Sequence, residues 1–253
     1  MTEEMSIESY LSQGGVLTNP TNVPPRYRAE LMKLMATFVD SELAGAAGFA
    51  DVINAGPGIK ERIAAARIVL EKTDHADKVL SIMGDFGADT ARYANHHPWT
   101  ARLPRDADIG TARGDHDMRL AVFNYPLQGW GDAVVMNLLM GLAVGEQMRD
   151  FSKVSYQPLA AAFREIAPVE QRHAELAAEG LERLLETGDK MSLQASVDYW
   201  APRVAASFGT GGADRLEALK AMGLRHTGMD EMRAAWAASA ASLLSGLGLS
   251  LNA

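Results

Sequence analysis

The segment Ala160–Leu184, AAAFREIAPVEQRHAELAAEGLERL, constrains the fold of this chain more than any other segment. Apolar residues recur in it every three or four positions, which is the periodicity of a helix with one buried face. Glu170 and His173 fall on that same face. A Glu-x-x-His on the inner face of a helix is a ligand arrangement of bundles that hold two metal ions. The same spacing also occurs on solvated helices, so a metal site requires matching residues elsewhere in the chain.

The apolar residues of the chain favour an all-helical fold. They make up 47% of its 253 residues, and most are Ala, Leu and Met in long segments with few β-branched runs. No apolar run reaches the roughly 18 residues that a membrane-spanning helix needs. The first residues also lack a basic flank followed by an apolar core. We therefore expect a soluble, cytoplasmic protein of fold class all-α.

The composition also excludes several classes of function. The chain has no cysteine, which excludes disulfides, thiolate catalysis and cysteine-bound zinc or iron–sulfur sites. A metal site would therefore need histidine and carboxylate ligands. The net charge of −8, without a clustered stripe of Lys and Arg, argues against nucleic-acid binding. No Gly-rich phosphate loop or nucleophile elbow is present.

Helical periodicity and breaker residues divide the chain into segments. Long helices are expected at about residues 25–54, 59–83, 129–151 and 160–188, the first ending at Gly56-Pro57-Gly58. An amphipathic segment at 191–208, with Pro202 as a kink or break, and shorter helices at 213–222 and 229–247 follow. Residues 1–24 are largely polar and end in prolines, which suits an extended arm. We therefore expect an N-terminal arm, 1–24, and a single helical domain, 25–253.

Charged residues interrupt the inner faces of the first two long helices. Glu42 lies on the apolar stripe of the first helix, where an unpartnered carboxylate would cost several kcal/mol. Lys72 and His75 lie on the apolar stripe of the second helix. Glu71 and Asp74 lie about 100° round that helix from Lys72 and His75, respectively, and we expect their side chains to be solvated. The polar residues of the inner stripes should therefore meet one another.

Two further regions carry residues that could bind a metal. The segment 84–117 contains His96 and His97, and later Asp115-His116-Asp117. A mobile or partner-facing loop is the better interpretation of this segment, and a metal site there is the minor alternative. Glu146, near the end of the third long helix, is expected to form a surface ion pair, because Arg149 and Asp150 follow it closely.

Five segments, in order, resemble one known family over roughly residues 25–252. They are DSELAG at 40–45, LEKTDHA at 70–76, FNYPLQGW at 123–130, VEQRHAEL at 169–176 and LRHTGMDEMR at 224–233. The sequence is similar to the phenylacetyl-CoA epoxidase (phenylacetic acid catabolic protein) family, and closest to its catalytic oxygenase subunit. The resemblance implies a ferritin-like four-helix bundle with extra C-terminal helices, a partner subunit of the same fold and an acyl-CoA substrate.

The resemblance also implies a set of metal ligands, of which this chain keeps four of six. The matching residues are Glu42, His75, Glu170 and His173. Lys72 stands where the family has a glutamate, three residues before His75. Counting on from FNYP, Gly141 stands where the family has an aspartate. Both losses are carboxylates, which a di-iron site needs to neutralise its charge.

Lys72 suggests how the core could be stabilised without a metal. Its ammonium can lie between Glu42 and Glu170 and satisfy both, giving a metal-replacing ion pair and no cofactor. One alternative is a single iron held by Glu42, His75, Glu170 and His173, with Lys72 displaced or deprotonated. Another is a two-metal oxygenase that uses Glu146. Pro168, two residues before Glu170, predicts a kink or bulge in the fourth helix.

These observations predict a family member with a degenerate di-metal site, acting as a structural or non-catalytic subunit. The alternative function is a metal-dependent monooxygenase that hydroxylates or epoxidises an aromatic acyl-CoA. The expected partners are a second copy of the chain or a same-fold partner subunit, with an acyl-CoA as ligand, and neither nucleic acid nor membrane.

Overall fold

A computed structural model describes residues 5–96, 98–113, 117–187, 189–210 and 212–252. Within these ranges the regular secondary structure is helical, and the single β-bridge, between Leu17 and Tyr156, belongs to no strand. The helices are α1 (Ile7–Ser12), α2 (Pro25–Val52), α3 (Ile59–Asp85), α4 (Thr90–His96), α5 (Gly129–Phe151), α6 (Gln157–Thr187), α7 (Lys190–Ala206), α8 (Ala213–Ala221) and α9 (Met229–Gly246). The predicted all-α fold is confirmed.

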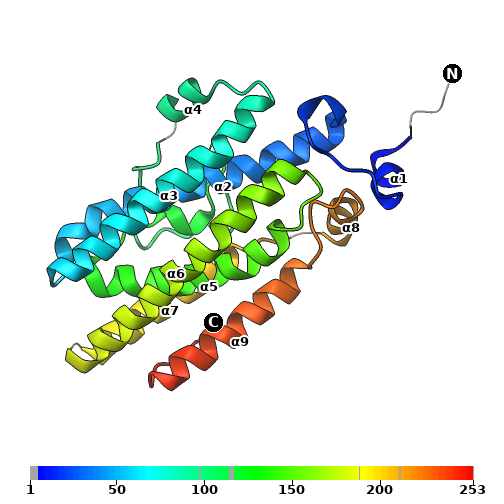
Figure 1. Cartoon of the computed structure of the whole chain (residues 1–253). Coiled ribbons are helices and arrows are strands. Elements are labelled where there is room, and N and C mark those ends of the chain that lie inside the picture. The colour runs from blue at the N-terminus through cyan, green and yellow to red at the C-terminus, as the bar shows by residue number, and fades with distance from the viewer. Residues whose placement is uncertain (1–4, 97, 114–116, 188, 211, 253) are drawn as a thin grey trace.

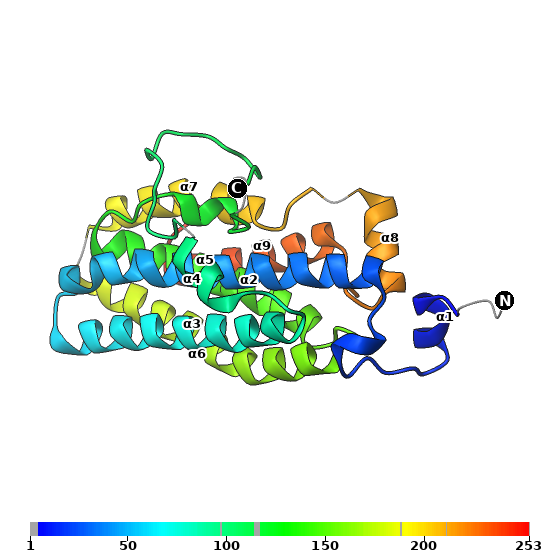
Figure 2. The same ribbon diagram turned by 90° about the horizontal axis from the view of Figure 1, so that it is seen from above.

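Four long helices form the bundle (Figures 1 and 2). The consecutive helices α2 and α3 pack against each other, α5 and α6 form a second pair, and α3 lies against α6. On its other side α5 contacts α7 and α9, the extra C-terminal helices. This is the ferritin-like arrangement that we predicted.

The helix α5 runs through the middle of the molecule. Every residue from Ala133 to Gly141 is buried, since α5 has neighbours on several sides. Trp236 of α9 is fully buried against α5 and donates its indole N–H to the carbonyl oxygen of Leu139 (3.0 Å). Because a nearly all-apolar helix must be covered all round, the sequence of α5 also accounts for α7 and α9 packing onto the bundle.

Two prolines lie inside helices without ending them. The helix α6 continues through Pro168, and α7 continues through Pro202. A proline removes one backbone hydrogen bond, and packing against α5 compensates for that loss in both helices. Of the kink or break that we predicted at Pro202, the break is therefore wrong.

We had expected the N-terminal segment to be an extended arm, but its described part is folded onto the bundle. Its described part contains α1, capped by the side chain of Ser6, and a short 3₁₀ turn at Pro20–Asn22. Leu17 is fully buried, and its carbonyl oxygen accepts a hydrogen bond from Gln157 N (2.8 Å). Leu17 and Val23 are buried in the core, and Ile7, Tyr10 and Leu11 pack against it, so these few apolar residues hold the segment to the bundle despite its largely polar composition.

The segment between α4 and α5 crosses the bundle without forming a long helix. Arg119 is buried, pairs with Asp117 and donates to the carbonyl oxygens of Pro98, Trp99 and Ala101. Asp40 of α2 accepts from Met118 N (2.7 Å). We had expected a mobile or partner-facing loop, whereas these buried hydrogen bonds fix its described part to α2.

No helix in the described part of the chain is long and apolar enough to cross a membrane.

Candidate functional site

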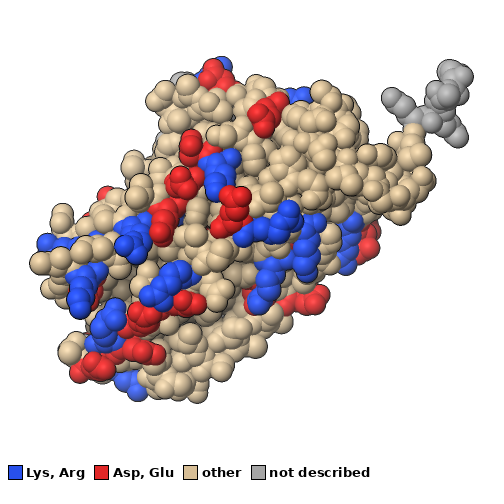
Figure 3. Space-filling view, in the orientation of Figure 1, with Lys and Arg blue, Asp and Glu red and all other residues tan. Residues whose placement is uncertain are grey.

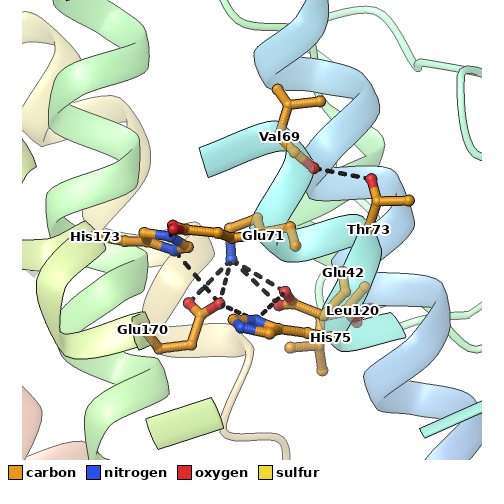
Figure 4. Close-up of polar contacts among 10 residues, drawn as sticks. Glu42, Val69, Glu71, Thr73, His75, Leu120, Glu170 and His173 are labelled. Carbon is orange, nitrogen blue, oxygen red and sulfur yellow. Dashed lines mark hydrogen bonds and ion pairs between the residues drawn. The ribbon is translucent and has the colours of Figure 1, made fainter. Parts of the chain in front are cut away.

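Three helices of the bundle bring five polar side chains together in its interior. Glu42 comes from α2, Lys72 and His75 from α3, and Glu170 and His173 from α6. Their exposed fractions are 4%, 8%, 4%, 2% and 1%, so water screens little of their charge. Figure 4 shows Glu42, His75 and Glu170 pointing toward one another. Each residue lies on the apolar stripe of its helix, and that is why packing the three stripes together places them in one cluster.

The ammonium group of Lys72 lies at the centre of this cluster. Its Nζ atom is 3.2 and 3.4 Å from the two carboxylate oxygens of Glu42, and 3.1 and 3.0 Å from those of Glu170. A lysine ammonium has three donor hydrogens and no acceptor, so it can donate to both carboxylates at once. The structure therefore places a positive charge between the two acidic groups.

His75 supplies a second cation to the same carboxylates. Its Nδ1 atom lies 3.0 Å from Glu170 Oε1 and 3.6 Å from Glu42 Oε2. Burial lowers the pKa of His75, but hydrogen bonds and charges from Glu170 and Glu42 outweigh burial and raise the pKa to about 9. Two carboxylates thus face two cations, and the charges of these four groups sum to zero.

The same interactions shift the pKa values of the other central groups. Burial alone would lower the pKa of Lys72, but the charges of Glu170 and Glu42 raise it above its usual value. Burial alone would raise the pKa of Glu170, but the charge of Lys72 and the two nearby histidines hold it well below its usual value. Each group therefore keeps its charge because its partners are close.

His173 lies at the edge of the cluster and contacts a residue that sequence reasoning missed. Its Nε2 atom lies 2.7 Å from Glu71 Oε2 of α3, so the carboxylate accepts the Nε2 proton. The Nδ1 atom is 3.4 Å from Glu170 Oε1, without the geometry of a hydrogen bond, and has no other described partner. We had expected Glu71 to be solvated, and its side chain is indeed 35% exposed. The contact with His173 was not expected, and it forms because α6 packs beside the flank of α3 on which Glu71 lies.

The helix α5 contributes no ligand to the cluster. A Cβ atom on Gly141 would lie 2.9 Å from the Cβ and 3.2 Å from the Cα of Ala174 in α6. Close packing of α5 on α6 therefore excludes a side chain at this position unless the helices move. Glu146 forms an ion pair with Arg149, one turn along α5. The two-metal alternative needed Glu146 as a metal ligand, and Glu146 is not part of the cluster.

The donor atoms present suit at most one metal ion. Ligand atoms of Glu42, His75 and Glu170 lie within 4.8 Å of one another and form a buried group that could hold a metal. A centre with two ions does not fit, since two carboxylates are missing and Lys72 adds a positive charge between those that remain. His97, Asp115 and His116 lie outside the described residues, so the structure says nothing of a site there.

A comparison with protein families decides what kind of protein carries this cluster. Residues 5–253 match the model of the family described as phenylacetic acid catabolic protein. The chain belongs to this family. The match covers the N-terminal segment as well as the bundle, so it extends beyond the segments that carried the resemblance. A comparison with curated proteins found no significant match.

A small cavity lies beside the cluster in this family member. Its volume is about 30 Å³, and its walls include Lys72, Glu170, Gly45 and Gly141. Most of the remaining lining is apolar, including Phe49, Val122, Phe123 and Met140. A Cβ atom on Gly45 would approach the ring of Phe123 to 3.2 Å, so a larger residue there would require the ring to shift slightly and would narrow this space.

A larger groove leads from Glu42 to the surface, and no sequence motif had indicated it. Its volume is about 1140 Å³, and its inner part is lined by apolar side chains such as Phe38, Phe123, Met140 and Phe151. Five cationic side chains line it against three acidic ones, Glu30, Glu42 and Asp230. The cations are Lys33, Arg113, Arg215, Arg225 and Arg233. The groove is therefore apolar inside and carries a cationic excess.

Proposed function

We propose that this chain is a structural, non-catalytic member of the phenylacetic acid catabolic family. The observation that carries the proposal is the position of Lys72, whose Nζ lies within 3.4 Å of all four carboxylate oxygens of Glu42 and Glu170. A metal ion that used these oxygens would compete with the ammonium for the same place. The proposed role is a scaffold or interaction subunit.

Charge balance supports this proposal. Lys72 and His75 together offset Glu42 and Glu170, so the interior needs no further cation. A divalent ion added to this set would leave two uncompensated positive charges in a buried site, which is strongly unfavourable. The metal-free cluster is thus favoured as long as Lys72 stays in place.

Iron analysis of protein from iron-supplemented cells tests the proposal directly. We expect far less than one iron per chain in the wild type, and near-stoichiometric iron would overturn the proposal. The Lys72→Glu variant restores a carboxylate three residues before His75 and should raise the iron content. Lys78→Glu, on the same helix but outside the cluster, is the matched control and should leave the iron content unchanged.

His173 supports a second candidate, a metal-dependent monooxygenase with one ion. Metal-binding histidines usually donate one ring N–H to a carboxylate and keep the other nitrogen for the metal. Here Glu71 accepts the Nε2 proton, and the buried Nδ1 has no hydrogen-bond partner among the described residues. A bound iron would supply oxygen activation for hydroxylating or epoxidising an aromatic acyl-CoA. If wild-type protein contains iron, Glu71→Gln should weaken its binding roughly 10–100-fold.

The groove supports retention of an acyl-CoA ligand in either case. Its apolar inner part suits an acyl group, and its cationic side chains suit phosphates, which Lys and Arg bind. We place the protein in the cytoplasm in this proposal, where CoA thioesters are available. Calorimetric titration with phenylacetyl-CoA should show binding, and the double variant Lys33→Glu/Arg113→Glu should weaken it at least tenfold. Absence of binding to the wild type would refute the ligand assignment.

A further inference from the structure

The large groove and the small cavity follow one another along α2 and α5. On α2, the groove is lined by Phe38, Ser41 and Glu42, and the cavity by Gly45, Gly48 and Phe49. On α5 the groove is lined by residues within 140–151 and the cavity by residues within 136–144. Steps of three or four residues keep these positions on one face of each helix. The two spaces therefore lie in line between the same two helices, which contact each other.

The side chain of Phe123 lies where the two spaces meet. It lines both of them, together with Met140 and Val144, which are one turn apart on α5. A Cβ atom on Gly45 would lie 3.2 Å from Cε1 of the Phe123 ring, so the ring lies beside the first part of the cavity. Met140 and Val144 thus form a side that both spaces share, and the ring of Phe123 stands between the groove and the cavity.

The buried cluster is divided in the same way. Glu42 lines the groove but not the cavity, whereas Lys72 and Glu170 line the cavity but not the groove. The groove therefore ends at Glu42 and the ring of Phe123. Apolar space continues behind the ring, where Phe49 is among the residues that line the cavity.

Cationic side chains lie at the exposed end of the groove. Lys33 and Arg215 are 54% and 64% exposed, and both contact the single carboxylate of Glu30, which leaves a net positive charge. On the face formed by α3 and α6, by contrast, Lys and Arg lie among Asp and Glu (Figure 3). Phe123 is only 8% exposed and lies at the buried end of the groove. A ligand with phosphates and an apolar chain would thus bind with its chain directed toward Phe123.

We propose that Phe123 sets the length of the acyl chain that the groove accepts. The inference rests on the acyl-CoA ligand proposed above and names the residue that ends its pocket. A chain can follow the apolar lining only as far as the ring of Phe123, because the ring stands between the groove and the cavity. With a smaller residue at this position, the groove and the cavity become one space that admits a longer chain.

Calorimetric titration of the full chain with straight-chain thioesters, from butanoyl-CoA to dodecanoyl-CoA, tests the proposal. For the wild type we expect the affinity to rise with each added methylene and to stop rising once the chain reaches Phe123. Each methylene buried in apolar surroundings contributes about fourfold in affinity. In Phe123→Ala the rise should continue for at least two more carbons, so that the longer chains bind roughly tenfold more tightly than to the wild type.

Phe38→Ala is the matched control. Phe38 is similarly buried, at 7% exposed, and lines the groove but not the cavity. This variant should weaken the binding of all chains without changing the length at which the affinity stops rising. Circular dichroism shows whether each variant is folded. If Phe123→Ala fails to fold, Phe123→Leu, which removes less volume, should show a smaller shift in the same direction.

The ligand assignment and the role of Phe123 fail in different ways. If the wild type binds none of the thioesters, the ligand assignment fails and the role of Phe123 fails with it. If the wild type binds them but its affinity rises through dodecanoyl-CoA, only the role of Phe123 is overturned. The same holds if folded Phe123 variants stop at the chain length of the wild type.

Discussion

Removing the ammonium of Lys72 gives the sharpest test of the buried ion-pair cluster. Lys72→Met keeps an unbranched, flexible side chain and takes away only the positive charge and its hydrogen bonds. Glu42 and Glu170 are 4% and 2% exposed, so water cannot replace the lost partner. His75 remains as a single cation beside two carboxylates, and the site gains one net negative charge.

The expected cost follows from breaking a buried ion pair. Removing one partner of such a pair typically costs about 3–5 kcal/mol, because the remaining charge stays buried without compensation. A domain of this size loses roughly 2–4 °C of melting temperature per kcal/mol. Lys72→Met should therefore lower the melting temperature by roughly 6–20 °C at pH 7.

A control and a rescue separate this effect from simple loss of a lysine. Lys78 is on the same helix and pairs with Glu165, but the two side chains are 38% and 67% exposed. Lys78→Met should cost less than about 1 kcal/mol, as exposed pairs do. Adding Glu42→Gln and Glu170→Gln to Lys72→Met removes the uncompensated charges and should recover most of the lost stability. An unchanged melting temperature for Lys72→Met would refute the ion-pair interpretation.

Three further predictions follow from neighbouring contacts. The folded pKa of His75 is about 9, above the ordinary 6.5, so its stabilisation is complete below pH 6.5 and is lost as the pH rises through 9. Between pH 6 and 10 the unfolding free energy of the wild type should fall relative to His75→Gln by about 3 kcal/mol, which urea titrations at each pH measure. Asp132 of α5 accepts from Arg105 and from Trp200 Nε1, and Asp132→Asn should therefore destabilise the protein by about 2–4 kcal/mol in the same assay. Gly141→Asp should lower the melting temperature rather than restore a metal ligand, and Ala174→Gly should partly reverse this loss, since the new Cβ meets Ala174 at 2.9 Å.

Helix positions were predictable because they depend on local sequence. The predicted helix at 129–151 matches α5, whose apolar centre follows Gly129, a residue with φ of 81°. Gly56-Pro57-Gly58 separates α2 from α3 as expected. Glu42, Lys72, His75 and Glu170 were predictable as a set, because each interrupts an apolar stripe and a buried charge requires a partner.

Residues outside the stripes could not be predicted in this way. Periodicity gives the angular position of Glu71 on α3, but its exposure depends on which helix lies beside that flank. Arg119 shows the same limit more strongly. It looks like a solvated charge in a polar segment, yet it is buried against carbonyl oxygens of residues about twenty positions earlier. The groove likewise combines residues from distant parts of the chain, and no local pattern reports such a surface.

The cavity beside Lys72 bears on whether the cluster can exchange its ammonium for a metal ion. Lys72 would have to move away from Glu42 and Glu170 before an ion could use their oxygens, and this cavity is the adjacent free space. Its volume is about 30 Å³, and its lining is mostly apolar. An ammonium moved there would leave four carboxylate oxygens for a site that offers few acceptors, so desolvation opposes the movement. The arrangement therefore favours the metal-free cluster, and a substitution that removes the ammonium, such as Lys72→Glu, is the change that should allow a metal to bind.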